Sequence, residues 1–339
     1  MAMPGPNNSK RRSRRGDVIQ MRAFPTLALC LALSGCNVVA NLDAVSTVKQ
    51  APVQRYDQFQ EVASNGKLLV GVGSHGVIVS SDNGGNSWKR TVLPGISSLI
   101  GVAACPDGSW VALDFYRKVW VADAAATKWD ARELATKANP LAIACDPKGQ
   151  YWVVGSRTTV LSSADKGTSW KSQDFGEDAI LMSIQFLDAD NAIITGEFGH
   201  LLTTKDGGGS WQQGKKIPND FFPHATLFTD ARTGWVSGLA GVILHTTDGG
   251  NNWVKQPGGI GAPMYALLKH QGEMYALGIN GLMLKLTAGE WKLIEGRPAP
   301  YLRSALSLGD KGMLIAGGAG TLQLFSPGAQ TAAPAAKKE

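Results

Sequence analysis

Four short segments of the chain carry an acidic or amide side chain in the same place, and a row of such groups could bind calcium or transfer protons. The segments end in tryptophan and cover residues 81–88, 163–170, 204–211 and 246–253. Each contains glycine, which supplies the positive φ of a tight turn, and Asp or Asn can accept backbone N–H groups inside such a turn. We therefore expect structural turn residues rather than catalytic or calcium-binding ones. The expected turn residues and closing tryptophans are Asn83, Trp88, Asp165, Trp170, Asp206, Trp211, Asp248 and Trp253.

Histidine and cysteine also fail to form a recognisable reactive site. The five histidines are scattered, at positions 75, 200, 224, 245 and 270, and no pair has the His-x₃-His spacing of a metal site. The sequence thus predicts no metal site, no cofactor and no catalytic residues.

The spacing of tryptophans shows which elements hold these turns. Trp88, Trp129, Trp170, Trp211 and Trp253 are 41, 41, 41 and 42 residues apart, and a period of about 40 residues is typical of propeller blades with four strands each. A second pattern also repeats along the chain, ahead of the tryptophan positions. It consists of an apolar run, a turn and another apolar run, as expected for a β-hairpin. Seven copies occur, at residues 69–79, 111–121, 153–161, 193–202, 236–244, 276–284 and 315–324.

We therefore predict an all-β fold, a seven-bladed β-propeller over residues 49–326. The last copy ends at Phe325 with no outer strand after it, whereas residues 48–56 precede the first copy as spare strand-like sequence. The sequence thus predicts that an N-terminal strand completes the last blade and closes the ring, which would leave no open sheet edge. The turns within the hairpins and the connections between blades should share one face, and the four Trp-terminated turns should lie on the other.

The start of the chain has the features of a signal peptide. Residues 24–33 form an apolar run too short to span a bilayer, and residues 33–36 read Leu-Ser-Gly-Cys, which resembles the bacterial lipobox. This resemblance implies cleavage after residue 35 and lipid attachment to Cys36, with either Met1 or Met21 as the start. We expect a cleaved leader at 1–35, a tether at 36–48 and a disordered tail at 327–339. Asn37 after the cysteine suggests the outer membrane facing the periplasm.

The leader also explains the basic composition. The chain has a net charge of +6, but residues 1–35 carry six basic residues and one acid, so the remainder carries only +1. A nucleic-acid partner is therefore not expected. Cys105 and Cys145 occupy equivalent places in adjacent blades; such places are usually too far apart for a disulfide, so two buried thiols are expected.

The repeated turn matches the Asp-box of the bacterial neuraminidase repeat family. That family's enzymes use an arginine triad, a Tyr–Glu nucleophile pair and an acidic proton donor, and carry a Phe/Tyr-Arg-Ile-Pro element. This tetrapeptide does not occur here, and the nearest fragment is Lys216-Ile217-Pro218. The comparison therefore predicts the fold without the hydrolase activity, so the protein is expected not to be an enzyme.

The whole arrangement resembles the photosystem II stability/assembly factor-like propellers. The lipobox, seven blades, the Gly-Glu-Phe-Gly segment at 196–199 and the repeated box sequences carry this resemblance. It implies a non-enzymatic scaffold that binds a membrane-protein complex or assembly intermediate through an arginine-bearing face, held at the membrane by a lipid anchor. Candidate residues of that face are Tyr116, Arg117, Arg157, Glu197, Phe198, Phe221, Phe222, Tyr301 and Arg303. The alternatives are an accessory of an envelope transporter, a sialidase-like glycan-binding or glycoside-hydrolase propeller, and a binding module for small ligands.

Overall fold

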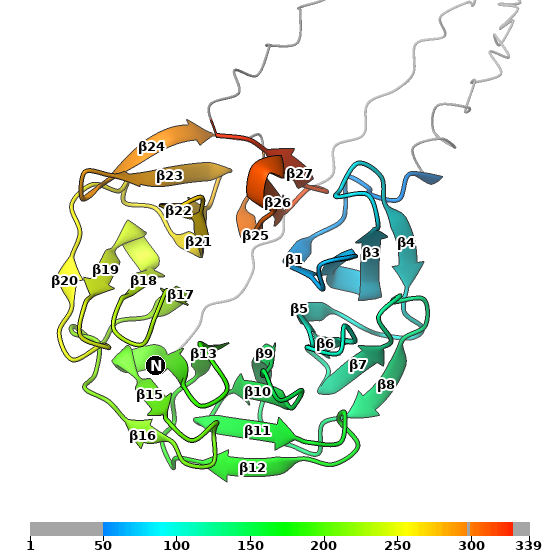
Figure 1. Ribbon diagram of the computed structural model, residues 1–339, viewed down its shortest axis with the longest axis horizontal. Coiled ribbons are helices and arrows are strands. Elements are labelled where there is room, and N and C mark those ends of the chain that lie inside the picture. The colour runs from blue at the N-terminus through cyan, green and yellow to red at the C-terminus, as the bar shows by residue number, and fades with distance from the viewer. Residues whose placement is uncertain (1–49, 297–298, 328–339) are drawn as a thin grey trace, which may run out of the picture. The chain divides into compact units, whose positions relative to one another are not determined.

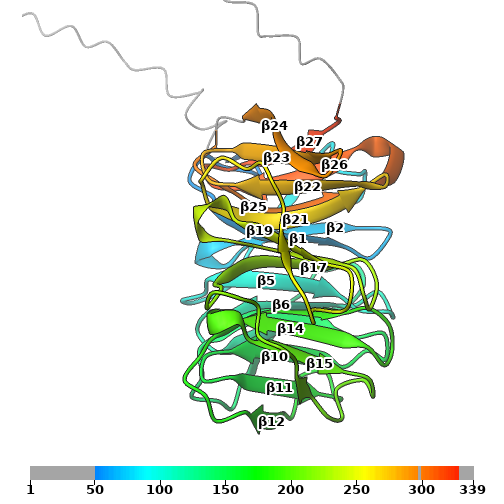
Figure 2. The same ribbon diagram turned by 90° about the vertical axis from the view of Figure 1, so that its left-hand side faces the viewer.

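The predicted seven-bladed propeller is confirmed by a computed structural model, which describes residues 50–296 and 299–327 (Figure 1). Seven antiparallel sheets follow one another around a central channel, and within each sheet the strands run in chain order from the channel to the circumference. Seen from the side, the sheets of successive blades pack face to face (Figure 2). The predicted leader, its lipobox cysteine Cys36, and the tether lie outside the described residues, as does the tail after residue 327.

The first strand of each blade lines the channel and the second strand packs behind it. The first strands are β1 (Phe59–Ser64), β5 (Leu99–Ala104), β9 (Pro140–Cys145), β13 (Leu181–Phe186), β17 (Pro223–Phe228), β21 (Met264–His270) and β25 (Leu302–Ser307). The second strands are β2 (Leu69–Gly73), β6 (Trp110–Asp114), β10 (Tyr151–Gly155), β14 (Ala192–Gly196), β18 (Gly234–Gly238), β22 (Glu273–Gly278) and β26 (Met313–Gly317). The second strands are buried almost throughout because neighbouring blades cover both of their faces, which is why they are continuous apolar runs.

Third and fourth strands complete the blades towards the circumference. The third strands are β3 (Val77–Ser81), β7 (Lys118–Ala122), β11 (Thr159–Ser163), β15 (Leu201–Thr204), β19 (Ile243–Thr246), β23 (Leu282–Thr287) and β27 (Leu322–Phe325). The fourth are β4 (Lys89–Val92), β8 (Asp130–Glu133), β12 (Lys171–Asp174), β16 (Gln212–Gln213), β20 (Val254–Lys255) and β24 (Glu290–Gly296). The described residues also contain four 3₁₀ turns, η1 (Ser74–Gly76), η2 (Glu197–Gly199), η3 (Leu239–Gly241) and η4 (Gly309–Lys311). None of the described helices is long and apolar enough to cross a membrane.

The strand order places the loops on two faces, as expected. The turns between second and third strands share one face with the connections between blades, and we call this the turn face. The Asp-box turns, between third and fourth strands, share the opposite face with the turns between first and second strands, and we call this the box face.

The closure of the ring differs from the prediction, because within residues 50–296 and 299–327 no N-terminal strand pairs with the last blade. Among the described residues that blade has three strands, β25, β26 and β27. Residues 51–58 instead make a turn: the backbone N–H of Asp57 donates to the Gln54 carbonyl at 2.9 Å, and the Gln54 N–H donates to the Asp57 carboxylate at 2.7 Å. The chain therefore turns between Gln54 and Asp57 instead of continuing as an extended strand.

Direct packing of the first blade on the last closes the ring instead. The backbone N–H of Gly320 donates to the Asp57 carbonyl at 2.8 Å, and the hydroxyl of Tyr301 donates to Gln58 Oε1 at 2.8 Å. A core formed by both blades lies behind these bonds, with members Phe59, Val62, Leu69, Val77, Val79, Leu314, Ala316 and Leu322. Apolar burial and a few polar bonds thus replace the expected strand pairing.

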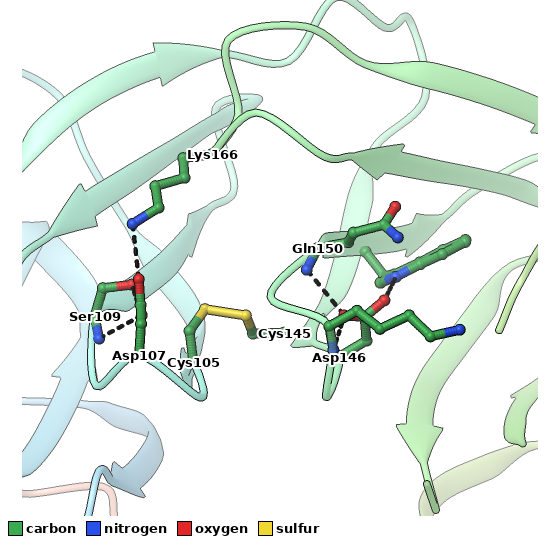
Figure 3. Close-up of a disulfide and its surroundings, with 9 residues drawn as sticks. Cys105, Asp107, Ser109, Cys145, Asp146, Gln150 and Lys166 are labelled. Atoms are coloured by element: carbon green, nitrogen blue, oxygen red, sulfur yellow. Dashed lines mark hydrogen bonds and ion pairs between the residues drawn. A yellow bond between two sulfur atoms is a disulfide. The ribbon is translucent and has the colours of Figure 1, made fainter. Parts of the chain in front are cut away.

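The two cysteines expected to be free thiols form a disulfide (Figure 3). Cys105 directly follows the first strand β5, and Cys145 is the last residue of the first strand β9. Their Cα atoms are 5.3 Å apart. Equivalent positions on neighbouring blades diverge towards the circumference, but first strands are closest together beside the channel, so this pair is within bridging distance. On the same face the Lys166 ammonium binds the Asp107 carboxylate at 2.8 Å, which adds a second link between blades 2 and 3.

Candidate partner-binding face

On the turn face, the turns between second and third strands have nearly the same backbone conformation in most blades, and each presents an outward side chain at the same position. Six of the seven turns between second and third strands have two successive residues with positive φ, as a two-residue type I′ hairpin requires. The first of the two is not glycine in any of these turns, and its φ lies between 54° and 59°. These residues are His75, Arg157, Phe198, Ala240, Asn280 and Ala319. Because all six are exposed, the fold holds a rigid turn while leaving its outward side chain free to vary.

Blade 2 has a different turn, which is held by a buried carboxylate. Asp114 accepts hydrogen bonds from the backbone N–H groups of Ser98 and Tyr116 at 3.1 and 3.0 Å, and from the Trp120 indole N–H at 3.1 Å. Only Arg117 has a positive φ in this turn, at 58°. The bonds to Asp114 fix the turn that exposes Phe115 and Tyr116, whose rings meet edge to face with centroids 5.5 Å apart.

Consecutive turns of blades 2 to 5 therefore form an exposed arc of aromatic, aliphatic and arginine side chains. Its members, which we call the turn arc, are Phe115, Tyr116, Arg117, Arg157, Phe198 and Leu239. Phe115, Tyr116, Phe198 and Leu239 expose 50, 49, 50 and 53% of their surface, respectively, which is high for large apolar residues. Phe115 and Leu239 are not among the residues predicted from the sequence, although each directly precedes a turn residue that could have suggested it.

Arg157 lies beside acidic side chains rather than in a purely basic surface. A cavity of about 440 Å³ next to it is lined by Asp174, Gly176, Glu177 and Asp178. In the part of the chain that the structure describes, none of these carboxylates forms an ion pair with Arg157, whereas Glu177 contacts His200 Nε2 at 3.0 Å. The arc is thus of mixed charge around Arg157.

Four of the candidate residues make contacts within the propeller. The Glu197 carboxylate accepts the Ile180 backbone N–H at 2.9 Å, and Phe221 packs in the core beside Val236 and Leu244. Phe222 is half-buried, with its ring centroid 5.6 Å from that of His224. Tyr301 makes the closing bond to Gln58 described above. These residues support the shape of the turn face more than they extend its exposed surface.

Arg303 is separated from the turn arc. It is the second residue of β25 and lines the central channel, where its guanidinium carbon lies 5.8 Å from the centre of the Tyr265 ring. The candidate residues therefore divide into an exposed arc, a supporting set and one arginine inside the channel.

The Asp-box carboxylates of the box face are occupied within their own turns. Asp165 accepts the Ser169 hydroxyl at 2.6 Å, the Ser169 N–H at 2.8 Å and the Ser163 hydroxyl at 2.8 Å. These bonds, the one from the Ser169 hydroxyl above all, lower the pKa of Asp165 to about 2. Asp206 repeats the pattern with Ser210, and its pKa is also about 2.

The other two boxes have the same contacts with different partners. Asp248 accepts the backbone and side-chain N–H groups of Asn252 at 2.9 and 2.7 Å, which lowers the pKa of Asp248. Asn83 accepts the Ser87 backbone N–H at 3.0 Å, so a neutral amide can fill the same turn. Within the described residues no group of three or more potential metal ligands occurs.

The fold and these turns define the class of protein: a seven-bladed propeller of Asp-box repeats with an exposed arc on its turn face. A family model described as photosynthesis system II assembly factor YCF48 matches residues 121–221 and 168–259. Over these residues the chain is similar to the Ycf48 family.

Two relatives support this likeness over part of the chain. The photosystem II assembly protein Ycf48 of Thermosynechococcus vestitus is 27% identical over 160 residues, which are 43% of this chain and 45% of that protein. The photosystem II assembly lipoprotein Ycf48 of Synechococcus sp. (strain CC9902) is 30% identical over 95 residues, which are 27% of this chain and 28% of that protein. The matched segments thus span less than half the length of either relative.

Solved structures share the fold at low sequence identity. Ycf48 from Cyanidioschyzon merolae aligns with a TM-score of 0.66 and 16% identity, over 82% of this chain and 98% of that one. A structure of Ycf48 bound to a D1 peptide aligns with a TM-score of 0.65 and 15% identity, over 80% of this chain and 92% of that one. A catalytically inactive virginiamycin B lyase from Staphylococcus aureus with quinupristin aligns with a TM-score of 0.67 and 12% identity, over 79% of this chain and 94% of that one. Because an enzyme shares the fold, the fold alone does not decide whether this chain catalyses a reaction. The family match does not favour the transporter-accessory or glycan alternatives.

Proposed function

We propose that the protein is a non-enzymatic scaffold that assists the assembly of a membrane-protein complex, with a photosystem II intermediate as the partner. The partner class follows from the relatives, which are named as photosystem II assembly proteins, one of them as a lipoprotein. The structure of a relative with a D1 peptide makes a segment of that subunit the first partner to test. Lipid attachment at Cys36 would hold the propeller at a membrane surface, in the periplasm or a thylakoid lumen.

The observation that carries this proposal is the turn arc. Binding sites between proteins depend on a few arginine and aromatic residues that become buried on association. Tyr116, Arg117, Arg157 and Phe198 provide these side chains on the turns of three consecutive blades of one face. The exposed rings of Phe115 and Tyr116 lie on a turn that is held by Asp114. A partner could therefore bind them without a change in the backbone of this turn.

The experiment compares binding of arc variants with that of a variant on the opposite face. The protein and its variants Tyr116→Ala/Arg117→Glu and Arg157→Glu/Phe198→Ala are used to recover photosystem II intermediates from solubilised membranes, and are titrated with labelled D1 segments. Each double variant should lose about tenfold or more in affinity, the size of change expected for hot-spot residues. Arg232→Glu, an exposed arginine on the box face, serves as the charge-matched control and should bind as the parent does. Equal recovery by all variants would exclude the turn arc as the binding site.

A further inference from the structure

A ring of seven side chains surrounds the channel at the end next to the turn face. In every first strand the pairing with the second strand slips between the first and third residues, so that the second residue has no partner. Such β-bulges redirect the side chain of the extra residue. All seven extra residues line one cavity of about 300 Å³, and all seven are half-buried.

The ring is divided into an apolar and a polar half. Blades 2, 3 and 4 contribute Ile100, Leu141 and Met182, which are adjacent in the ring. Blades 5, 6, 7 and 1 contribute the other members, His224, Tyr265, Arg303 and Gln60. Because the bulge occurs in every blade while the residue types change at two places, the division arises from the sequence and not from the backbone.

Arg303 is the cationic group of the polar half and has no carboxylate partner in contact. Among the described residues it forms no ion pair or hydrogen bond, and its one ring contact is with Tyr265. The Tyr265 ring in turn meets the His224 ring with centroids 5.3 Å apart. Burial, followed by the charge of Arg303, lowers the pKa of His224, so this histidine is neutral near pH 7 and Arg303 provides the positive charge.

Glu61 is the acidic residue among those that line the cavity, and its hydrogen bond is to the next blade rather than to Arg303, although the charge of Arg303 acts to lower the pKa of Glu61. Its Oε2 atom accepts the backbone N–H of Val102 in the next blade at 2.9 Å. Gly101 makes room for this contact, since a Cβ atom there would lie 3.1 Å from the same oxygen. Burial raises the pKa of Glu61 to about 7, so its charge only partly balances that of Arg303 at neutral pH.

We propose that this ring binds a small monocarboxylate with an apolar body, with the carboxylate on Arg303 and the body against Ile100, Leu141 and Met182. Arginine binds carboxylates through two parallel hydrogen bonds, and a half-buried site strengthens them. The opposite wall excludes water from a short hydrocarbon chain or aromatic ring, and a cavity of about 300 Å³ is at the lower end of the range for small-molecule sites. This binding site goes beyond the proposed scaffold function and does not depend on it.

The test uses four probes that separate the two halves of the site. Hexanoate carries both features, acetate lacks the apolar body, and hexanol lacks the charge; N-acetyl-leucine represents the carboxyl end of a polypeptide. Calorimetric titration of the full-length protein should show binding of hexanoate or N-acetyl-leucine at least tenfold tighter than that of acetate or hexanol. The stronger of the first two identifies a free acid or a chain terminus as the source of the group.

Variants of each half decide whether the ring is the site. Arg303→Gln should reduce the affinity for hexanoate at least tenfold without changing that for hexanol. Met182→Gln should also reduce the affinity for hexanoate, because it makes the apolar side of the cavity polar. Arg117→Gln, which removes an arginine from the turn arc, is the matched control and should bind hexanoate as the parent does. If hexanoate and N-acetyl-leucine bind no better than acetate, or if both ring variants retain the parent's affinity, the proposal is wrong. Since Met182→Gln leaves Arg303 in place, it provides the test even if Arg303→Gln does not fold.

Discussion

Asp57 and Arg90 form a two-pronged ion pair, in which the terminal nitrogens of the arginine donate to the two carboxylate oxygens at 2.8 and 2.9 Å. Arg90 lies on β4, the outer strand of blade 1, and Asp57 lies in the turn before β1. The Asp57 backbone also accepts the Gly320 N–H of blade 7, so one residue links the N-terminal turn to the first and last blades. Asp57 thus takes part in closing the ring, for which strand pairing had been expected.

The ion pair should be important for stability because its carboxylate is buried. The Asp57 side chain is 1% exposed and that of Arg90 17%, and removal of one partner from a buried pair typically costs about 3–5 kcal/mol. Asp57→Ala should therefore lower the free energy of unfolding by about 3 kcal/mol, as measured by urea denaturation. Asp82→Ala, which breaks the exposed pair of Asp82 with the neighbouring Lys89, is the control and should cost less than about 1 kcal/mol. Equal effects of the two substitutions would contradict a stabilising role of the Asp57–Arg90 ion pair.

The disulfide should stabilise the contact between blades 2 and 3. Cys105 and Cys145 are 40 residues apart, and closure of a loop of that length reduces the entropy of the unfolded chain by an amount equivalent to about 4 kcal/mol. The variant Cys105→Ser/Cys145→Ser should be about 2–4 kcal/mol less stable than the oxidised protein. Dithiothreitol should lower the stability of the parent to that of the variant and leave the variant unchanged. If the reductant does not affect the parent, the two cysteines are not paired in solution.

The repeats explain how much of this molecule could be predicted from its sequence. The seven hairpin copies predict the number of blades, and the four box motifs predict the place of Asp165 and Asp206 in turns, because each copy is a local structure. The ring closure through Asp57 and Gly320 could not be predicted, since it joins single residues without a repeated pattern. The proximity of Cys105 and Cys145 depends on how closely the first strands approach around the channel. Arg303 reaches the channel only because of a slip in strand pairing, which leaves no mark in the residue types.

Acid should weaken the Asp-box turns within a defined pH range. In the folded protein the pKa of both Asp165 and Asp206 is about 2, below the ordinary value of 3.8. A group with a depressed pKa stabilises the fold fully above its unfolded value, and this contribution is lost as the pH falls from about 4 through 2. The variant Asp165→Asn/Asp206→Asn should fold, since Asn83 fills the equivalent turn of blade 1. Its melting temperature should fall less than that of the parent between pH 5 and pH 2. A parallel decline of both proteins would show that these carboxylates do not titrate with folding.

Glu61 should produce the opposite dependence at higher pH. The other six first strands have Gly, Ala or Ser where blade 1 has Glu61, and burial of this carboxyl raises its pKa from 4.5 to about 7. A carboxylic acid with a raised pKa binds its proton more tightly in the folded state. Its favourable contribution is therefore complete below about pH 4.5 and is lost as the pH rises through 7.

The size of this effect can be measured with a substitution that keeps the hydrogen bond. At 1.36 kcal/mol per pKa unit the shift corresponds to about 3 kcal/mol, and the opening of the channel to water reduces it to about 2 kcal/mol. Glu61→Gln still accepts the Val102 N–H but does not ionise, so the variant should gain about 2 kcal/mol relative to the parent between pH 5 and pH 8. Urea denaturation at the two pH values measures this difference, with Glu133→Gln on the exposed strand β8 as the control. If Glu61→Gln and the parent change in parallel, Glu61 ionises in the channel as readily as in the unfolded chain.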